Sequence, residues 1–244
     1  MLGWRMRVDI WSDVICPWCF LGKRRFERAV AQLPFGDEVE VRWRAYQLDP
    51  RAPKEPGDLR TAIERKYGPG AFDGMTRRLT ALGVEEGIAY RFDIAQRVNT
   101  VDAHRLLEWA TTLGATPQDG LVAQDRLQER LFRAYFEEGA NVADHATLAS
   151  LAAEAGLDEE QAREVLASHA FADEVATDLE GALDREITGV PAFVVEDRLL
   201  IPGAQDVETL VAILSRAHER FATSVTVAPG VAAGEACAVD DPRC

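Results

Sequence analysis

The sequence has little positive charge and no long apolar segment. Its 244 residues include 27 lysines and arginines against 41 aspartates and glutamates, which leaves a formal net charge of −14. A chain this acidic argues against nucleic acid or an anionic membrane as a main partner. No segment approaches the roughly 18 apolar residues that a transmembrane helix needs, and residues 1–7 lack the apolar core of a secretory signal. We therefore expect a cytoplasmic protein without a membrane partner.

Cysteine is also scarce, with four in the whole chain. Two lie in the segment Cys16-Pro17-Trp18-Cys19, and the other two, Cys237 and Cys244, lie near the end of the sequence. Because cytoplasmic thiols are normally kept reduced, a Cys-x-x-Cys pair there is more typical of a catalytic or metal-binding site than of a structural disulfide.

The Cys-x-x-Cys pair follows the strand-like residues 8–11 and precedes a helical pattern over residues 21–33. This context predicts that Cys16 lies at a helix N-terminus, where free N–H groups and the helix dipole favour negative charge. Such a position stabilises a thiolate, which is the attacking species in disulfide exchange. Cys19 then lies one turn away, within reach of the Cys16 sulfur. The residues alone also allow half of a zinc site or two ordinary thiols.

Secondary-structure patterns divide the chain into two α/β segments separated by a long helical one. Residues 39–46 alternate apolar and polar side chains, so the first segment reads β-α-β with a parallel strand pair. Helical patterns then continue for more than a hundred residues, punctuated by glycines such as Gly83. The expected helix N-caps are Thr116, Asp144, Asp158 and Asp206. Strand patterns return at residues 191–195 and 199–201 as a hairpin, followed by a helix over 207–221.

These patterns predict four parts. They are a first core half (6–57), a helical insertion (58–187), a second core half (188–222) and a flexible tail (223–244) rich in alanine, glycine, proline and valine. The fold class expected is α/β, with a large all-helical insertion between the two halves.

Several segments carry a resemblance to a known family. They are residues 12–23, Asn99-Thr100, Ala103-His104-Arg105, residues 134–139 and residues 189–193. With a Cys-x-x-Cys pair after the first strand, the two core halves resemble the thioredoxin fold, and the inserted helices resemble its DsbA branch. The motifs are similar to those of the FrnE-like cytosolic group within that branch. The resemblance covers about residues 6–222.

The resemblance implies a thiol-disulfide oxidoreductase or isomerase without a cofactor or metal. Cys16 would be the attacking cysteine, Cys19 the resolving one, and Pro191 a cis-proline opposite them. Pro17, Trp18, Val190 and Pro191 would contact the substrate, with the Val190 backbone free to pair with an extended peptide. Substrates would be disulfide-containing or thiol proteins, and glutathione or another thiol would be the electron donor.

Two other functions are compatible with the sequence. The same family contains glutathione-dependent isomerases and transferases of small molecules, but these usually carry serine at the place of Cys16. A zinc-binding redox sensor would use all four cysteines, Cys16, Cys19, Cys237 and Cys244, as thiolate ligands. For Pro191 the residues alone also allow a trans proline that starts a strand.

The tail cysteines have three interpretations of equal weight. In the first, Cys237 and Cys244 are a second redox pair that relays electrons to Cys16 and Cys19. In the second, they form a small closed loop that fixes the tail in place. In the third, they have no specific role. The acidic residues around them disfavour a thiolate, so slower attack than by Cys16 is expected. By contrast, His104 and Arg105 lie on a predicted helix and are interpreted as structural residues.

Overall fold

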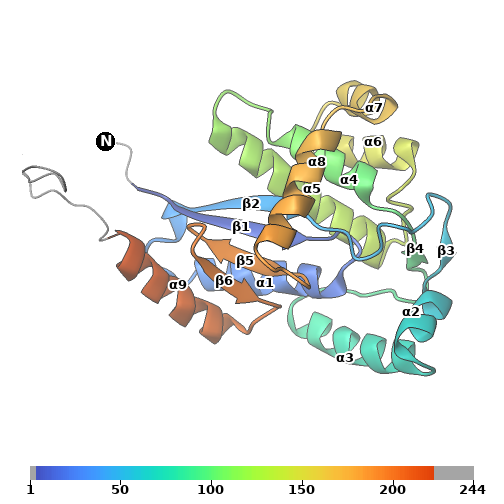
Figure 1. The fold of residues 1–244 in the computed structure, drawn as a ribbon, viewed down its shortest axis with the longest axis horizontal. Helices are drawn as coiled ribbons and strands as arrows, with labels where there is room; N and C mark the ends of the chain where they lie inside the picture. The colour runs from blue at the N-terminus through green and yellow to red at the C-terminus, as the bar shows by residue number, and fades with distance from the viewer. Residues whose placement is uncertain (1–3, 223–244) are drawn as a thin grey trace, which may run out of the picture.

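The computed structural model describes residues 4–222, and its centre is a four-stranded mixed sheet with the order β2-β1-β5-β6 (Figure 1). The strands are β1 (Met6–Ser12), β2 (Val39–Ala45), β5 (Ala192–Val195) and β6 (Leu199–Pro202). β1 runs parallel to β2, with Ile10 opposite Trp43, and antiparallel to β5, with Ile10 opposite Phe193. The predicted β-α-β unit and C-terminal hairpin are therefore confirmed.

Helices make up most of the remaining chain. They are α1 (Pro17–Val30), α2 (Leu59–Tyr67), α3 (Ala71–Glu85), α4 (Val101–Ala110), α5 (Pro117–Glu137), α6 (His145–Glu154), α7 (Glu159–Ala167), α8 (Ala172–Asp184) and α9 (Val207–Ala222), with a short 3₁₀ turn at Gly36–Glu38. The expected arrangement, with many helices between the two halves of the sheet, is confirmed. Among residues 4–222, no helix combines the length and the apolarity needed to cross a membrane.

The two faces of the sheet are covered by different helices. Apolar side chains of α1 and α9, including Phe26 and Leu214, bury one face against Ile10 and Phe193. The other face packs through Trp11 against α8, whose Asp178 carbonyl accepts a hydrogen bond from the Trp11 indole at 2.9 Å. Helices α4–α7 gather at one end of the sheet, and α2 and α3 form a pair below them in Figure 1.

The core of the inserted helices is continuous with the first turns of α1. One cluster of buried apolar residues contains Cys16, Cys19 and Phe20 together with Leu127 and Phe132 of α5. Four large side chains of α5 in the same cluster are all at most 1% exposed, namely Leu131, Phe132, Tyr135 and Phe136. The Cys-x-x-Cys segment therefore lies at the junction of the sheet and the insertion.

Three details differ from the sequence prediction. The first helix begins at Pro17 rather than residue 21, because Cys16 itself is the N-cap and proline suits the first helical position. The insertion is not all helical, since β3 (Gly57–Asp58) pairs antiparallel with β4 (Gln96–Arg97). Gly83 lies within α3 instead of ending a helix.

The predicted helix starts are confirmed. The side chains of Asp144 and Asp158 accept hydrogen bonds from backbone N–H groups three residues on, as does that of Asp206. Thr116 forms a reciprocal capping box with Asp119. Each such cap satisfies an N–H group that would otherwise lack an intrahelical partner.

Candidate active site

The two cysteines occupy the start of α1 as the sequence predicts. Cys16 is the N-cap, with extended backbone angles (φ −88°, ψ 112°), and its N–H donates to the Asp13 carbonyl at 2.9 Å. Pro17 is the first helical residue and Cys19 the third. Both thiols are free in the structure, and both are buried.

The second core half brings Val190 and Pro191 to this helix start. The Val190–Pro191 peptide bond is cis, as the family resemblance implies. The Cys16 thiol faces the Val190 carbonyl, with 3.5 Å between sulfur and oxygen. Segments 174 residues apart in the sequence thus meet at one sulfur atom.

Gly22 allows α1 to approach the cis-proline closely. A Cβ atom at this position would lie 2.9 Å from Cγ of Pro191 and 3.5 Å from the ring of Phe193. Any larger residue would therefore push the helix away from the loop that carries Val190 and Pro191.

Cys19 is fully buried behind Cys16. Burial raises the pKa of the Cys19 thiol well above its usual value, and the adjacent Cys16 raises it further, whereas the Ser12 hydroxyl and the Asp13 amide act in the opposite direction. Cys19 therefore stays protonated at neutral pH, and a protonated thiol is a poor nucleophile.

Trp18 and Pro191 line a cavity of about 460 Å³. Its other walls come from the loop before β5 and from the end of β6, including Thr188, Val190 and Pro202. The guanidinium of Arg78 on α3 lies 5.4 Å from the centre of the Trp18 ring. Cys16 itself is only 3% exposed and does not line this cavity. Val190, whose carbonyl faces the Cys16 sulfur, does line it.

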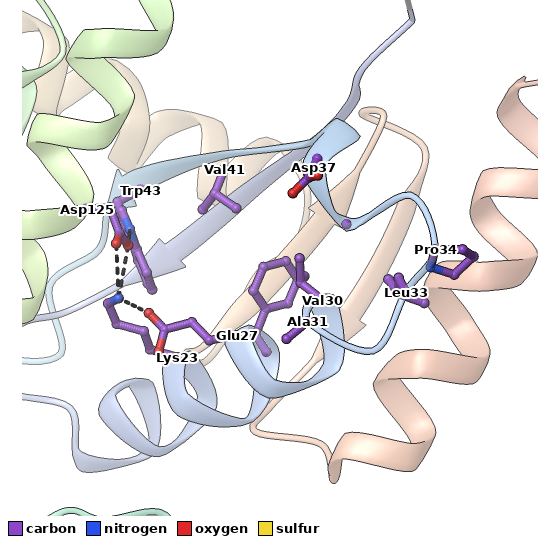
Figure 2. A pocket seen from close by; sticks show the side chains of 12 residues that line it. Lys23, Glu27, Val30, Ala31, Leu33, Pro34, Asp37, Val41, Trp43 and Asp125 are labelled. Carbon is purple, nitrogen blue, oxygen red and sulfur yellow. Dashed lines mark hydrogen bonds and ion pairs between the residues drawn. The ribbon is translucent and has the colours of Figure 1, made fainter.

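A second cavity, of about 510 Å³, lies between α1 and β2 and contains no cysteine. Figure 2 shows Lys23 at one end, pointing toward Glu27 and Asp125, with Val30 and Val41 along the wall. The Lys23 ammonium is 3.0 Å from the Asp125 carboxylate, and this ion pair joins α1 to α5 of the insertion. This ion pair therefore fixes the position of α1 relative to α5, and the cavity beside it is separate from the two cysteines.

His104 and Arg105, which the sequence analysis interprets as structural residues, are both buried on α4. His104 is 2% exposed, and its Nε2 lies 3.5 Å from an oxygen of the buried Asp13. Arg105 donates to the backbone carbonyls of Val165, Ser168 and Ala170 and pairs with Asp102. It thereby fastens the end of α7 to α4.

One residue at the site was not identified from the sequence. Tyr90, between α3 and β4, donates its hydroxyl to the Pro17 carbonyl at 2.5 Å. No local pattern marks it, because its partner lies 73 residues away. The one sequence feature connected with it is Gly83, whose lack of a side chain leaves room for the Tyr90 ring.

The predicted second redox pair, Cys237 and Cys244, lies outside the described residues. Within residues 4–222, no group of three or more His, Cys, Asp or Glu side chains is arranged to hold a metal ion. Of the four cysteines that the zinc-sensor alternative requires, the structure describes two, Cys16 and Cys19.

The chain is similar in sequence and structure to several known proteins. The family model of the DSBA-like thioredoxin domain matches residues 7–215. The crystal structure of a probable DsbA oxidoreductase from Streptomyces coelicolor is 36% identical, with a TM-score of 0.81 and 97% of each chain covered. The uncharacterized protein YwbO of Bacillus subtilis is 27% identical over 82% of this chain and 90% of its own length. The cytosolic disulfide reductase DsbM from Pseudomonas aeruginosa shares the fold at 18% identity, with a TM-score of 0.60 over 88% of this chain and 99% of that one.

Proposed function

The chain belongs to the DSBA-like thioredoxin domain family, and from this premise we propose that it exchanges disulfides with protein substrates through Cys16 and Cys19. The observation that carries the proposal is the contact between the Cys16 thiol, at the N-cap of α1, and the carbonyl of the residue before cis-Pro191. A thiolate formed there lies at the positive end of a helix, next to backbone that an extended peptide can reach.

In the reducing direction, the Cys16 thiolate attacks one sulfur of a substrate disulfide. A Cys16–substrate S–S bond forms, the substrate S–S bond breaks, and the leaving sulfur takes up a proton. Cys19 then loses its proton and attacks the Cys16 sulfur, which releases the substrate as a second thiol and leaves a Cys16–Cys19 disulfide. Two electrons pass from the cysteine pair to the substrate, and glutathione or another thiol donor returns them. The oxidising direction is the reverse of these steps.

The order of attack follows from burial. Because the pKa of Cys19 is raised, Cys19 is not the first nucleophile and acts once its neighbour is in a mixed disulfide. Trp18 and Pro191 would bind the substrate through the cavity that they line. We propose the cytoplasm as the site of action, where substrate and donor thiols are kept reduced.

The experiment is reduction of insulin and refolding of scrambled ribonuclease by the full-length protein. Cys16→Ser should abolish both activities, and Cys19→Ser should accumulate a mixed disulfide that is visible by non-reducing mass analysis. Cys19→Ser is the matched comparison, because it removes the other thiol and keeps the nucleophile. Retention of full activity in Cys16→Ser would reject the assignment.

Two measurements separate this function from the alternatives. Stoichiometric zinc in the reduced protein would favour a four-cysteine sensor, and turnover of an aromatic pyruvate-type substrate with bound glutathione would favour a small-molecule isomerase. A redox titration with Cys237 and Cys244 intact, and again with both changed to serine, tests the second redox pair. An unchanged midpoint and unchanged rate of recycling would reject that role.

A further inference from the structure

Tyr90 is a buried tyrosine whose hydroxyl reaches the active-site turn. It is 6% exposed, and its ring contacts the rings of Phe20, Phe92 and Phe136. Its hydroxyl donates to the Pro17 carbonyl at 2.5 Å. The residue therefore joins the insertion to the peptide group between the two cysteines.

The acceptor of this hydrogen bond, the Pro17 carbonyl, lies in the first turn of α1, directly after Cys16. The Pro17 carbonyl and the Trp18 N–H belong to the same peptide group, and Trp18 is the second residue of α1. An N-cap side chain that carries an acceptor is bonded by the N–H of the second or third helical residue. The Cys19 N–H, at the third position, donates to the Cys16 carbonyl at 3.0 Å. The Cys16 side chain accepts no cap hydrogen bond in the structure. The Trp18 N–H is therefore the first-turn donor that a thiolate at Cys16 would use.

We propose that Tyr90 is a positioning residue that stabilises the Cys16 thiolate through the Pro17–Trp18 peptide group. A donor on the carbonyl oxygen polarises the amide, so that its N–H becomes a stronger donor to the sulfur. The inference rests on the proposed role of Cys16 as the attacking cysteine. It adds a group from the insertion that tunes this cysteine without touching the substrate.

The surroundings of Tyr90 suit this role. Burial raises the pKa of its hydroxyl, and Cys16 and Cys19 raise it further, while Arg24 has the opposite effect. Tyr90 therefore remains a protonated donor over the whole range in which a thiol ionises. The ring position depends on Gly83, where a Cβ atom would lie 2.5 Å from a ring carbon of Tyr90.

The test compares Tyr90→Phe with Tyr135→Phe in the full-length protein. Tyr135 is also a buried tyrosine, and its hydroxyl donates to a backbone carbonyl, that of Gln96, at 2.6 Å. Both variants lose one buried hydrogen bond, but only Tyr90→Phe loses one to the active-site turn. Alkylation of Cys16 by iodoacetamide is measured from pH 5 to 9 by mass analysis of the peptide that contains it.

Tyr90→Phe should slow alkylation at neutral pH by about 1.3- to 4.5-fold, since amide polarisation changes a charge-assisted hydrogen bond by about 10–30%. Its pH profile should shift to higher pH by the corresponding amount. Tyr135→Phe should follow the wild-type profile, although urea unfolding should show comparable losses of stability in both variants. An unchanged profile in Tyr90→Phe, or equal shifts in both variants, overturns the inference.

Alkylation needs no protein substrate, so the two proposals can fail separately. If wild type does not reduce insulin but Tyr90→Phe still shifts the profile, the proposed function is rejected and the role of Tyr90 stands. If wild type reduces insulin and Tyr90→Phe is alkylated like wild type, the function stands and the role of Tyr90 is rejected.

Discussion

Glu108→Gln tests a buried charge cluster between the insertion and the sheet. Glu108, on α4, is 3% exposed and accepts a hydrogen bond from Arg42 of β2 at 2.9 Å. The pKa of Glu108 is raised from 4.5 to about 7, chiefly by burial and then by the negative charge of Asp178 on α8, while Arg42 opposes the shift. Asp178 in turn accepts from Arg44 and from the Ala45 N–H. Three elements thus meet at one carboxyl group.

The raised pKa makes protein stability depend on pH. The native state holds the Glu108 proton more tightly than the unfolded chain, so the stabilisation is fully present below pH 4.5 and is lost as pH rises through about 7. One pKa unit corresponds to about 1.4 kcal/mol, so the loss amounts to about 2 to 3 kcal/mol between pH 5 and 8. Glutamine resembles the protonated form and carries no such dependence.

Relative to wild type, Glu108→Gln should therefore gain about 2 to 3 kcal/mol of unfolding free energy between pH 5 and 8. Urea unfolding, followed by tryptophan fluorescence at both pH values, measures this difference. The control is Glu159→Gln, at a side chain 44% exposed in a surface pair with Arg163, where the difference should stay within a few tenths of a kcal/mol. A Glu108→Gln difference that does not change with pH would refute the reasoning.

Two further substitutions test the packing around the site. Gly22→Ala places a Cβ 2.9 Å from Pro191 and should cost about 1–3 kcal/mol in urea unfolding while slowing insulin reduction. Gly74→Ala in α3, where a Cβ meets nothing within 4 Å, should instead stabilise the protein by about 0.5–1 kcal/mol, and equal effects of the two would contradict the argument. Arg105→Lys loses the fork that reaches three carbonyls and should cost about 3 kcal/mol. A loss below about 1 kcal/mol in thermal or urea unfolding would show that Arg105 is dispensable.

Local residue chemistry determined much of the fold. Alternating and helical apolar patterns located the strands and most helices, and short-range side-chain hydrogen bonds made the caps at Thr116, Asp144 and Asp158 readable from neighbouring residues. The strand-to-helix position of Cys16 and Cys19 was likewise local, and together with the family resemblance it indicated the chemistry. The two-residue strands β3 and β4 were not predicted, because each depends on a partner about 40 residues away rather than on its own pattern.

The environment of the cysteine pair was decided only by the tertiary structure. Contacts between Cys16 and Val190, between Gly22 and Pro191, and between Tyr90 and Pro17 join segments whose separation in sequence has no periodic signature. The same holds for the burial that raises the pKa values of Cys19 and Glu108, because desolvation is a property of all the chain packed around a group. The residues along the chain thus determine that a thiol pair starts a helix, while the packing around that helix determines that Cys19 is buried and holds its proton strongly.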